Sequence, residues 1–115
     1  MKINYFALPG LVGLKDLRVN TVKSVVLENL GVSWESLIGE SRLRPLPDAR
    51  KMFAYCIRKY CGKVTSIALG KLINKDHATI LYYYKRTEHL REYDAEFRET
   101  LELIKYKINE QNRTI

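Results

Sequence analysis

Apolar residues recur along this chain with the 3.6-residue period of buried helix faces, and almost nowhere with the two-residue alternation of strands. This pattern predicts an all-α domain of six helices, with a central helix-turn-helix at about 65 to 90. The predicted helices run from Asn20 or Thr21 to Gly31, Ser33 to Gly39, Pro47 to Gly62, Thr65 to about Ile73, from Asp76 onward, and from about Asp94 onward.

Polar and glycine residues stand where these helices should begin and end. Ser33, Thr65 and Asp76 are suited to N-cap positions, because their side-chain oxygens accept hydrogen bonds from the unpaired N–H groups of the first turn. Residues 1 to 19, with scattered glycine and proline, lack a clear period, and we expect an irregular N-terminal arm there. The predicted domain therefore spans residues 20 to 115.

The helix after Pro47 should be the centre of the core. Its apolar residues form one continuous stripe, and Arg50, Lys51 and Arg58 are expected on the opposite face. The other helices each add a shorter apolar stripe. The predicted core residues are Val22, Val25, Val26, Leu30, Trp34, Leu37, Ile38, Ala49, Met52, Phe53, Cys56, Ile57, Tyr60, Ile80, Tyr83, Tyr84, Thr87, Phe97, Leu101, Ile104 and Ile108.

A basic loop of restricted shape precedes the central helix. In the stretch Arg42-Leu43-Arg44-Pro45-Leu46-Pro47, two prolines exclude regular helix and hold the backbone extended. We expect the two arginines to project from it.

Positive charge is concentrated in the middle of the chain. The whole sequence of 115 residues has a formal charge of +7, but the segment from Arg42 to Arg86 holds eleven basic residues and two acidic ones, which gives it +9. The flanking residues hold nine basic and eleven acidic side chains. A protein polarised in this way is expected to turn one side toward phosphates, as a nucleic-acid-binding protein does.

Several other classes of protein fit poorly. The two cysteines, Cys56 and Cys61, lack the further ligands of a zinc site, so we expect buried reduced thiols. The chain has only two histidines, His77 and His89, and no recognisable nucleophile–base pair, so we expect neither an enzyme nor a cofactor. No apolar run predicts a membrane span or a secretory signal, which makes a cytoplasmic protein the default expectation.

The most informative stretch is Lys75-Asp76-His77-Ala78-Thr79, at the predicted start of the fifth helix. In a helix-turn-helix, this end of the second helix meets base edges in the major groove. A carboxylate can accept from cytosine N4, an imidazole can bond a base edge, and a methyl group can pack on the thymine methyl. Each residue also has a simpler alternative role that involves no DNA. Asp76 would then serve as the helix cap alone, His77 would be an ordinary surface residue, and Ala78 would be a good helix former.

Taken together, these motifs resemble the C-terminal DNA-binding domain, domain IV, of the bacterial replication initiator DnaA, whose fold is Trp-repressor-like. The resemblance runs from about Val22 to Leu90. It rests on Leu30-Gly31-Val32-Ser33 with Leu37-Ile38, on Ser41-Arg42-Leu43-Arg44, on Ala49-Arg50, and on Lys75-Asp76-His77-Ala78-Thr79-Ile80. The last stretch is similar to the family's Arg-Asp-His-Thr-Thr-Val signature, with Lys75 in place of arginine and Ala78 in place of threonine.

The resemblance implies a double-stranded DNA partner and a set of contacts. Arg42 is expected in the minor groove, and Asp76, His77 and Ala78 at base edges in the major groove. Phosphate contacts are expected from Arg44, Arg50, Lys51, Lys71, Lys75 and Thr79. Ser66 and Lys71 are the weaker candidates, because solvated surface explains them equally well.

The sequence contains no Gly-x-x-x-x-Gly-Lys-Ser/Thr stretch, so we expect no bound nucleotide and no ATP-driven assembly. A stand-alone binding domain with an accessory or regulatory role in replication or transcription is the expectation. Two alternatives remain: a non-specific DNA binder, and a protein–protein adaptor that docks through Tyr82, Tyr83 and Tyr84.

Overall fold

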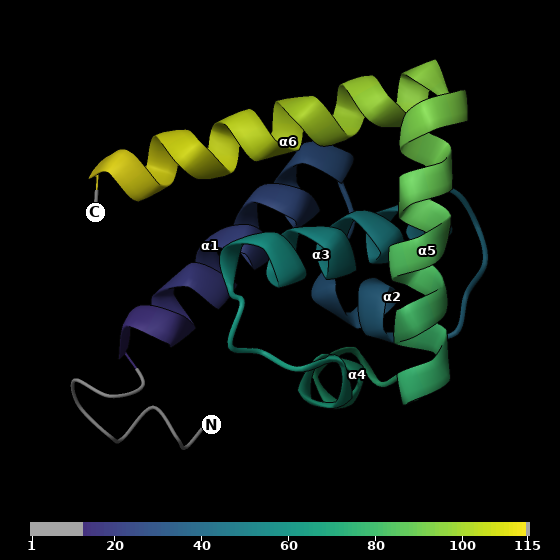
Figure 1. The fold of residues 1–115 in the computed structure, drawn as a ribbon, viewed down its shortest axis with the longest axis horizontal. Coiled ribbons are helices and arrows are strands. Elements are labelled where there is room, and N and C mark those ends of the chain that lie inside the picture. Colours follow the sequence, from purple (N-terminus) through teal and green to yellow (C-terminus); the bar gives the residue numbers. More distant parts are fainter. Residues whose placement is uncertain (1–12, 115) are drawn as a thin grey trace.

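The computed structural model describes residues 13–114, and the side chains of residues 18–111 within them. Across that part of the chain the secondary structure is entirely helical. The six helices are α1 (Gly13–Leu30), α2 (Trp34–Ile38), α3 (Leu46–Tyr60), α4 (Ser66–Ile73), α5 (His77–Tyr93) and α6 (Ala95–Thr114) (Figure 1). The predicted all-α fold with six helices is confirmed.

Helix α1 starts earlier than the sequence pattern predicts. Residues 13–19 belong to this helix, whereas the sequence predicts an irregular arm up to residue 19; residues 1–12 lie outside the described part. Packing supports the extra turns, because Val19 lies against the core and Arg18 Nη1 donates to the carbonyl of Tyr60 at 3.3 Å. Tertiary contacts of this kind stabilise a helical segment that has little periodicity of its own.

The three predicted N-caps are confirmed. Ser33 Oγ accepts from the N–H of Ser36 at 3.1 Å, Thr65 Oγ1 from Ala68 at 3.1 Å, and Asp76 Oδ1 from Thr79 at 2.8 Å. Each bond satisfies an N–H that has no partner within its helix. Helices α2, α4 and α5 therefore begin where the sequence predicts.

Helix α3 is the centre of the core, as its apolar stripe predicts. It packs against α1, α5 and α6, which surround it in Figure 1. Its buried residues include Ala49, Met52, Phe53, Cys56 and Ile57. The ring of Trp34, on α2, packs edge-on against the Phe53 ring, with 5.7 Å between the ring centroids. Cys56 and Cys61 are both buried and are not joined in a disulfide, and burial raises the pKa of the Cys56 thiol to about 12. The prediction that both cysteines are buried is confirmed.

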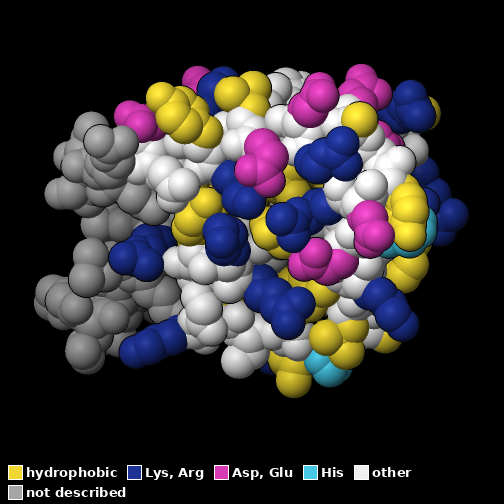
Figure 2. Space-filling view, turned by 45° about the horizontal axis from the view of Figure 1, so that its top comes forward, with side chains coloured by type: hydrophobic (Ala, Val, Ile, Leu, Met, Phe, Trp, Pro, Cys, Tyr) yellow, Lys and Arg dark blue, Asp and Glu magenta, His cyan; other side chains and the backbone are white. Residues whose placement is uncertain are grey.

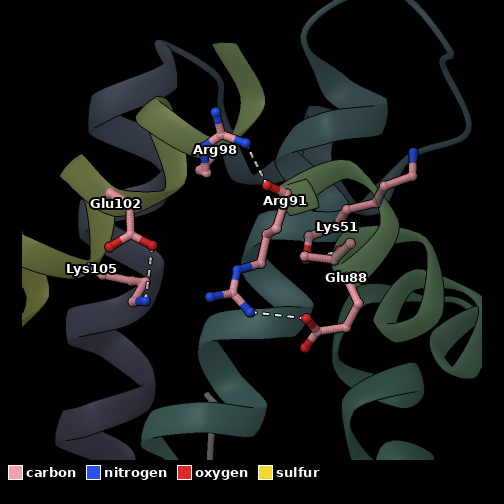
Figure 3. Close-up of polar contacts among 7 residues, drawn as sticks. Lys51, Glu88, Arg91, Arg98, Glu102 and Lys105 are labelled. Atoms are coloured by element: carbon pink, nitrogen blue, oxygen red, sulfur yellow. Dashed lines mark hydrogen bonds and ion pairs between the residues drawn. The ribbon is translucent and has the colours of Figure 1, made fainter. Parts of the chain in front are cut away.

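The junction of α5 and α6 fixes the direction of α5. Asp94 Oδ1 accepts from the N–H of Phe97 at 3.0 Å and so caps α6, while Arg98 Nη1 donates to the carbonyl of Arg91 at 2.8 Å (Figure 3). Arg91 also pairs with Glu88 at 2.9 Å on the same helix. These contacts hold the C-terminal end of α5 on the body, so that its N-terminal end projects at the opposite edge (Figure 1).

No helix among the described residues is long and apolar enough to cross a membrane. Within the same residues, His, Cys, Asp and Glu side chains form no cluster able to hold a metal ion.

Candidate nucleic-acid interface

Helices α4 and α5 meet in a tight turn that depends on Gly70. Asn74 adopts the left-handed conformation, with φ 64°, and the N–H of Lys75 donates to the carbonyl of Gly70 at 2.8 Å. A Cβ atom on Gly70 would lie 2.5 Å from the carbonyl oxygen of Lys75. The absence of a side chain there lets the turn close over α4 and sets the start of α5.

The start of α5 is exposed, while the rest of the helix is anchored. Asp76, His77 and Ala78 are exposed and Thr79 is half-buried, whereas Ile80, Tyr83 and Thr87 face the core. Hydrogen bonds from Thr79, through its hydroxyl and then its backbone N–H, lower the pKa of Asp76. The three residues predicted to contact bases in the major groove, Asp76, His77 and Ala78, thus lie together on the exposed tip of a well-anchored helix.

Leu46 and Pro47, predicted to continue the extended backbone of the basic loop, are instead the first residues of α3. The basic loop is therefore residues 40–45, between α2 and α3, and it is exposed along its whole length. Leu43 N–H donates to Ser41 Oγ at 3.2 Å, and the carbonyl of Leu43 accepts from the N–H of Leu46 at 2.9 Å. Arg42 and Arg44 lie on either side of Leu43 with exposed side chains. Figure 1 shows the loop at the edge of the molecule that also carries α5.

Arg50 lies in the interior, although the sequence predicts it on the open face of α3 and in contact with a phosphate. Only 4% of the residue is exposed. Its Nε donates to the carbonyl of Leu37 at 2.7 Å and its Nη1 to Ser41 at 2.7 Å; its Nη2 donates to Ser36 and Gly39, both at 3.0 Å. The guanidinium therefore holds the end of α2 and the start of the basic loop, a positioning role in place of the predicted surface role.

Lys75 joins the helix-turn-helix to the basic loop. Its Nζ donates to the carbonyl of Gly39 at 2.8 Å, so the residue before the α5 cap is bonded to the residue before the loop. Burial, and then the nearby Arg50, lower the pKa of this amine. Sequence reasoning missed this connection, since 36 positions separate the two residues and a backbone carbonyl has no sequence signal.

The remaining predicted phosphate contacts differ in exposure. Arg44 and Lys71 are exposed. Lys51 is half-buried, its Nζ lies 3.4 Å from the carbonyl of Pro47, and burial lowers its pKa more than Asp48 raises it. In Figure 3 the Lys51 side chain points away from the Arg91–Glu88 pair.

Charge is unevenly distributed over the surface. On the face shown in Figure 2, Asp and Glu side chains gather mainly in the upper half, and the lower edge carries Lys, Arg and His side chains with no acidic one in view. The α6 side therefore mixes both signs, as the sequence predicts for the flanks of the basic segment. An anion approaching the lower edge meets mostly positive charge.

The tyrosine run of α5 does not form one docking surface. Tyr82 is 55% exposed, but Tyr83 is buried and Tyr84 is half-buried with the guanidinium of Arg58 4.5 Å from its ring centroid. Two of the three rings are thus part of the domain's own packing. An adaptor surface built on all three tyrosines has no basis in this arrangement.

Comparison with known proteins agrees with this geometry. The family model for the bacterial dnaA protein helix-turn-helix matches residues 19–87. The chromosomal replication initiator protein DnaA of a Synechococcus species is 29% identical over 94 residues, which cover 78% of this chain and 19% of that protein. DnaA of Borrelia hermsii is 27% identical over 83% of this chain, and DnaA of Thermodesulfovibrio yellowstonii 26% identical over 84%. The chain spans about a fifth of the length of these relatives.

Proposed function

Because this chain belongs to the bacterial DnaA helix-turn-helix family, we propose that it binds double-stranded DNA sequence-specifically, with the tip of α5 in the major groove and the basic loop in the adjacent minor groove. The observation that carries the proposal is the hydrogen bond that joins the residue before the α5 cap to the residue before the basic loop. Lys75 Nζ holds the carbonyl of Gly39, so that the α5 tip and the basic loop form one surface. An exposed helix tip beside a basic loop suits adjacent grooves of one duplex.

Three residues on the α5 tip are proposed to read bases. Asp76 caps the helix through Oδ1, which orients the carboxylate, and its two oxygens have further lone pairs that can accept from cytosine N4. His77 is exposed and can bond a base edge, and the exposed methyl group of Ala78 can pack on the thymine methyl. Capping and base recognition are therefore compatible at Asp76.

The basic residues are proposed to divide into two groups. Arg42 enters the minor groove, whose narrow regions attract arginine, and Arg44, Lys51, Lys71 and Thr79 contact phosphates. Arg50 and Lys75 act through the protein, because their donors bond to backbone carbonyls that fix the loop and the turn. We propose no cofactor and no nucleotide for this function, and a cytoplasmic location stays a prediction.

The decisive experiment selects bound duplexes from a random pool and titrates the recovered duplex against a scrambled control over a salt series. We expect an enriched sequence, a steep loss of affinity with salt, and tighter binding to the recovered duplex. His77→Ala should weaken binding to the recovered duplex by about 1–3 kcal/mol and leave binding to the scrambled duplex unchanged.

His89 offers a matched control, because it is an exposed histidine near the other end of α5 and bonds Arg86 at 2.7 Å. His89→Ala should keep the wild-type preference. Binding that falls with salt but shows no enriched sequence would instead indicate a non-specific binder. Absence of binding at low salt would overturn the proposal altogether.

A regulatory or accessory role in replication or transcription is the biological setting we propose. The relatives named above are replication initiators, and this chain matches about a fifth of their length. A site selected from genomic fragments near an origin would favour replication, and one upstream of genes would favour transcription.

A further inference from the structure

Leu43 is a large, exposed apolar side chain in the basic loop. It is 75% exposed, the highest exposure among the exposed large apolar residues of the described part. Its neighbours on both sides, Arg42 and Arg44, are exposed as well, whereas Leu46, the next leucine along, is buried. A single exposed leucine is ordinary on a protein surface. This leucine differs because the residues before and after it in the sequence are both arginines.

The backbone holds Leu43 in place. Its N–H donates to Ser41 Oγ at 3.2 Å, and its carbonyl accepts from Leu46 at 2.9 Å. Arg50 fixes the preceding segment through the carbonyls of Gly39 and Ser41, and Pro45 restricts the following backbone. The side chain is therefore presented on a fixed turn, with little ordering left to do when a partner binds.

We infer that Leu43 is a wedge that inserts between base pairs from the minor groove and kinks the bound duplex. This inference rests on the DNA binding proposed above. The arginines on either side would follow the negative potential of the groove floor and walls, and the leucine between them would be carried against the base edges. Apolar side chains in that position partly unstack one base step and bend DNA toward the major groove.

A wedge also gives sequence preference without hydrogen bonds. Pyrimidine–purine steps unstack more readily than others, so a duplex with such a step opposite Leu43 should bind more tightly. Leu43 would then act as a specificity residue at a position that α5 does not reach.

The test uses the duplex recovered by selection, with 2-aminopurine placed in turn at positions flanking the α5 site and with a fluorophore pair on its ends. Wild-type protein should raise the 2-aminopurine fluorescence at one step and shorten the end-to-end distance. Leu43→Ser should abolish both signals and weaken binding about tenfold, while Leu43→Met should retain them. Leu103→Ser is the matched control, because Leu103 is an exposed leucine on α6, 46% exposed.

Two results would overturn the inference while DNA binding stands: wild-type protein that binds with no fluorescence change at any step, or Leu43→Ser that binds with the same change and bend. If the wild-type protein does not bind DNA at all, both the proposed function and the wedge are overturned. A loss of both signals in Leu103→Ser as well would attribute them to the fold and not to Leu43.

Discussion

At the scale of single residues, Arg50 shows how a charge can serve the fold. The sequence pattern places Arg50 on the solvent-facing side of α3. Its guanidinium nevertheless donates to four backbone carbonyls, which belong to the end of α2 and the start of the basic loop. Two of these carbonyls, those of Ser36 and Leu37, are at the C-terminal end of a helix, where the backbone dipole favours a positive charge. The interaction ties together segments that would otherwise lack a common anchor.

Replacing Arg50 by methionine keeps most of the stem and removes every donor. We expect the free energy of unfolding to fall by about 3 kcal/mol, since the partly buried carbonyls lose charged donors. Urea unfolding followed by circular dichroism measures this change. Arg58→Met, on the exposed part of the same helix, should cost less than about 1 kcal/mol through its contact with Tyr84. Equal losses in the two variants would contradict a special role for Arg50.

At the scale of elements, the pair α4–α5 is defined by its turn. Asn74 in the left-handed conformation and the approach of the Lys75 carbonyl to Gly70 allow α5 to start after only the three residues 74–76 that follow α4. The caps at Thr65 and Asp76 could be predicted from sequence, because an N-cap is a local interaction over three residues. The close approach at Gly70 could not, since it depends on how the chain returns over the helix.

Gly70→Ala should distort this turn. Its Cβ would lie 2.5 Å from a backbone oxygen that cannot rotate away, and we expect a destabilisation of about 1–3 kcal/mol. Thermal unfolding measures the loss. Gly62→Ala is the control, because a Cβ there meets nothing within 4 Å. It should change stability by no more than about 0.5 kcal/mol, and a Gly70→Ala protein as stable as this control would mean that the turn adjusts at little cost.

At the scale of the whole molecule, charge polarity should govern affinity. The formal charge of +9 between Arg42 and Arg86 is carried by the basic loop, the helix-turn-helix, α3 and the α3–α4 connection, while the sequence outside this segment holds more acidic than basic side chains. Binding to DNA releases one counterion for each phosphate neutralised, so each basic contact adds to the salt dependence.

Arg44→Ala should therefore lower the slope of log K against log salt concentration by about one. The decrease should be the same on the recovered and the scrambled duplex, as expected for a phosphate contact. Fluorescence anisotropy over a salt series gives the slope. Lys107→Ala, on α6 and bonded to Asn29 at 2.8 Å, should leave it unchanged. A slope that changes with Lys107 and not with Arg44 would place the DNA on the opposite face.

Local patterns in the sequence were enough to predict the helices, most of their boundaries, the buried stripe of α3 and the tip of α5 with Asp76, His77 and Ala78. These features follow from local rules, namely helical periodicity and capping within three or four residues. Contacts between distant segments explain why α1 includes residues from Gly13 onward, why Arg50 is buried, and why Lys75 bonds Gly39. Each of these depends on residues far apart in the chain and on backbone carbonyls, which every residue carries and no sequence pattern distinguishes.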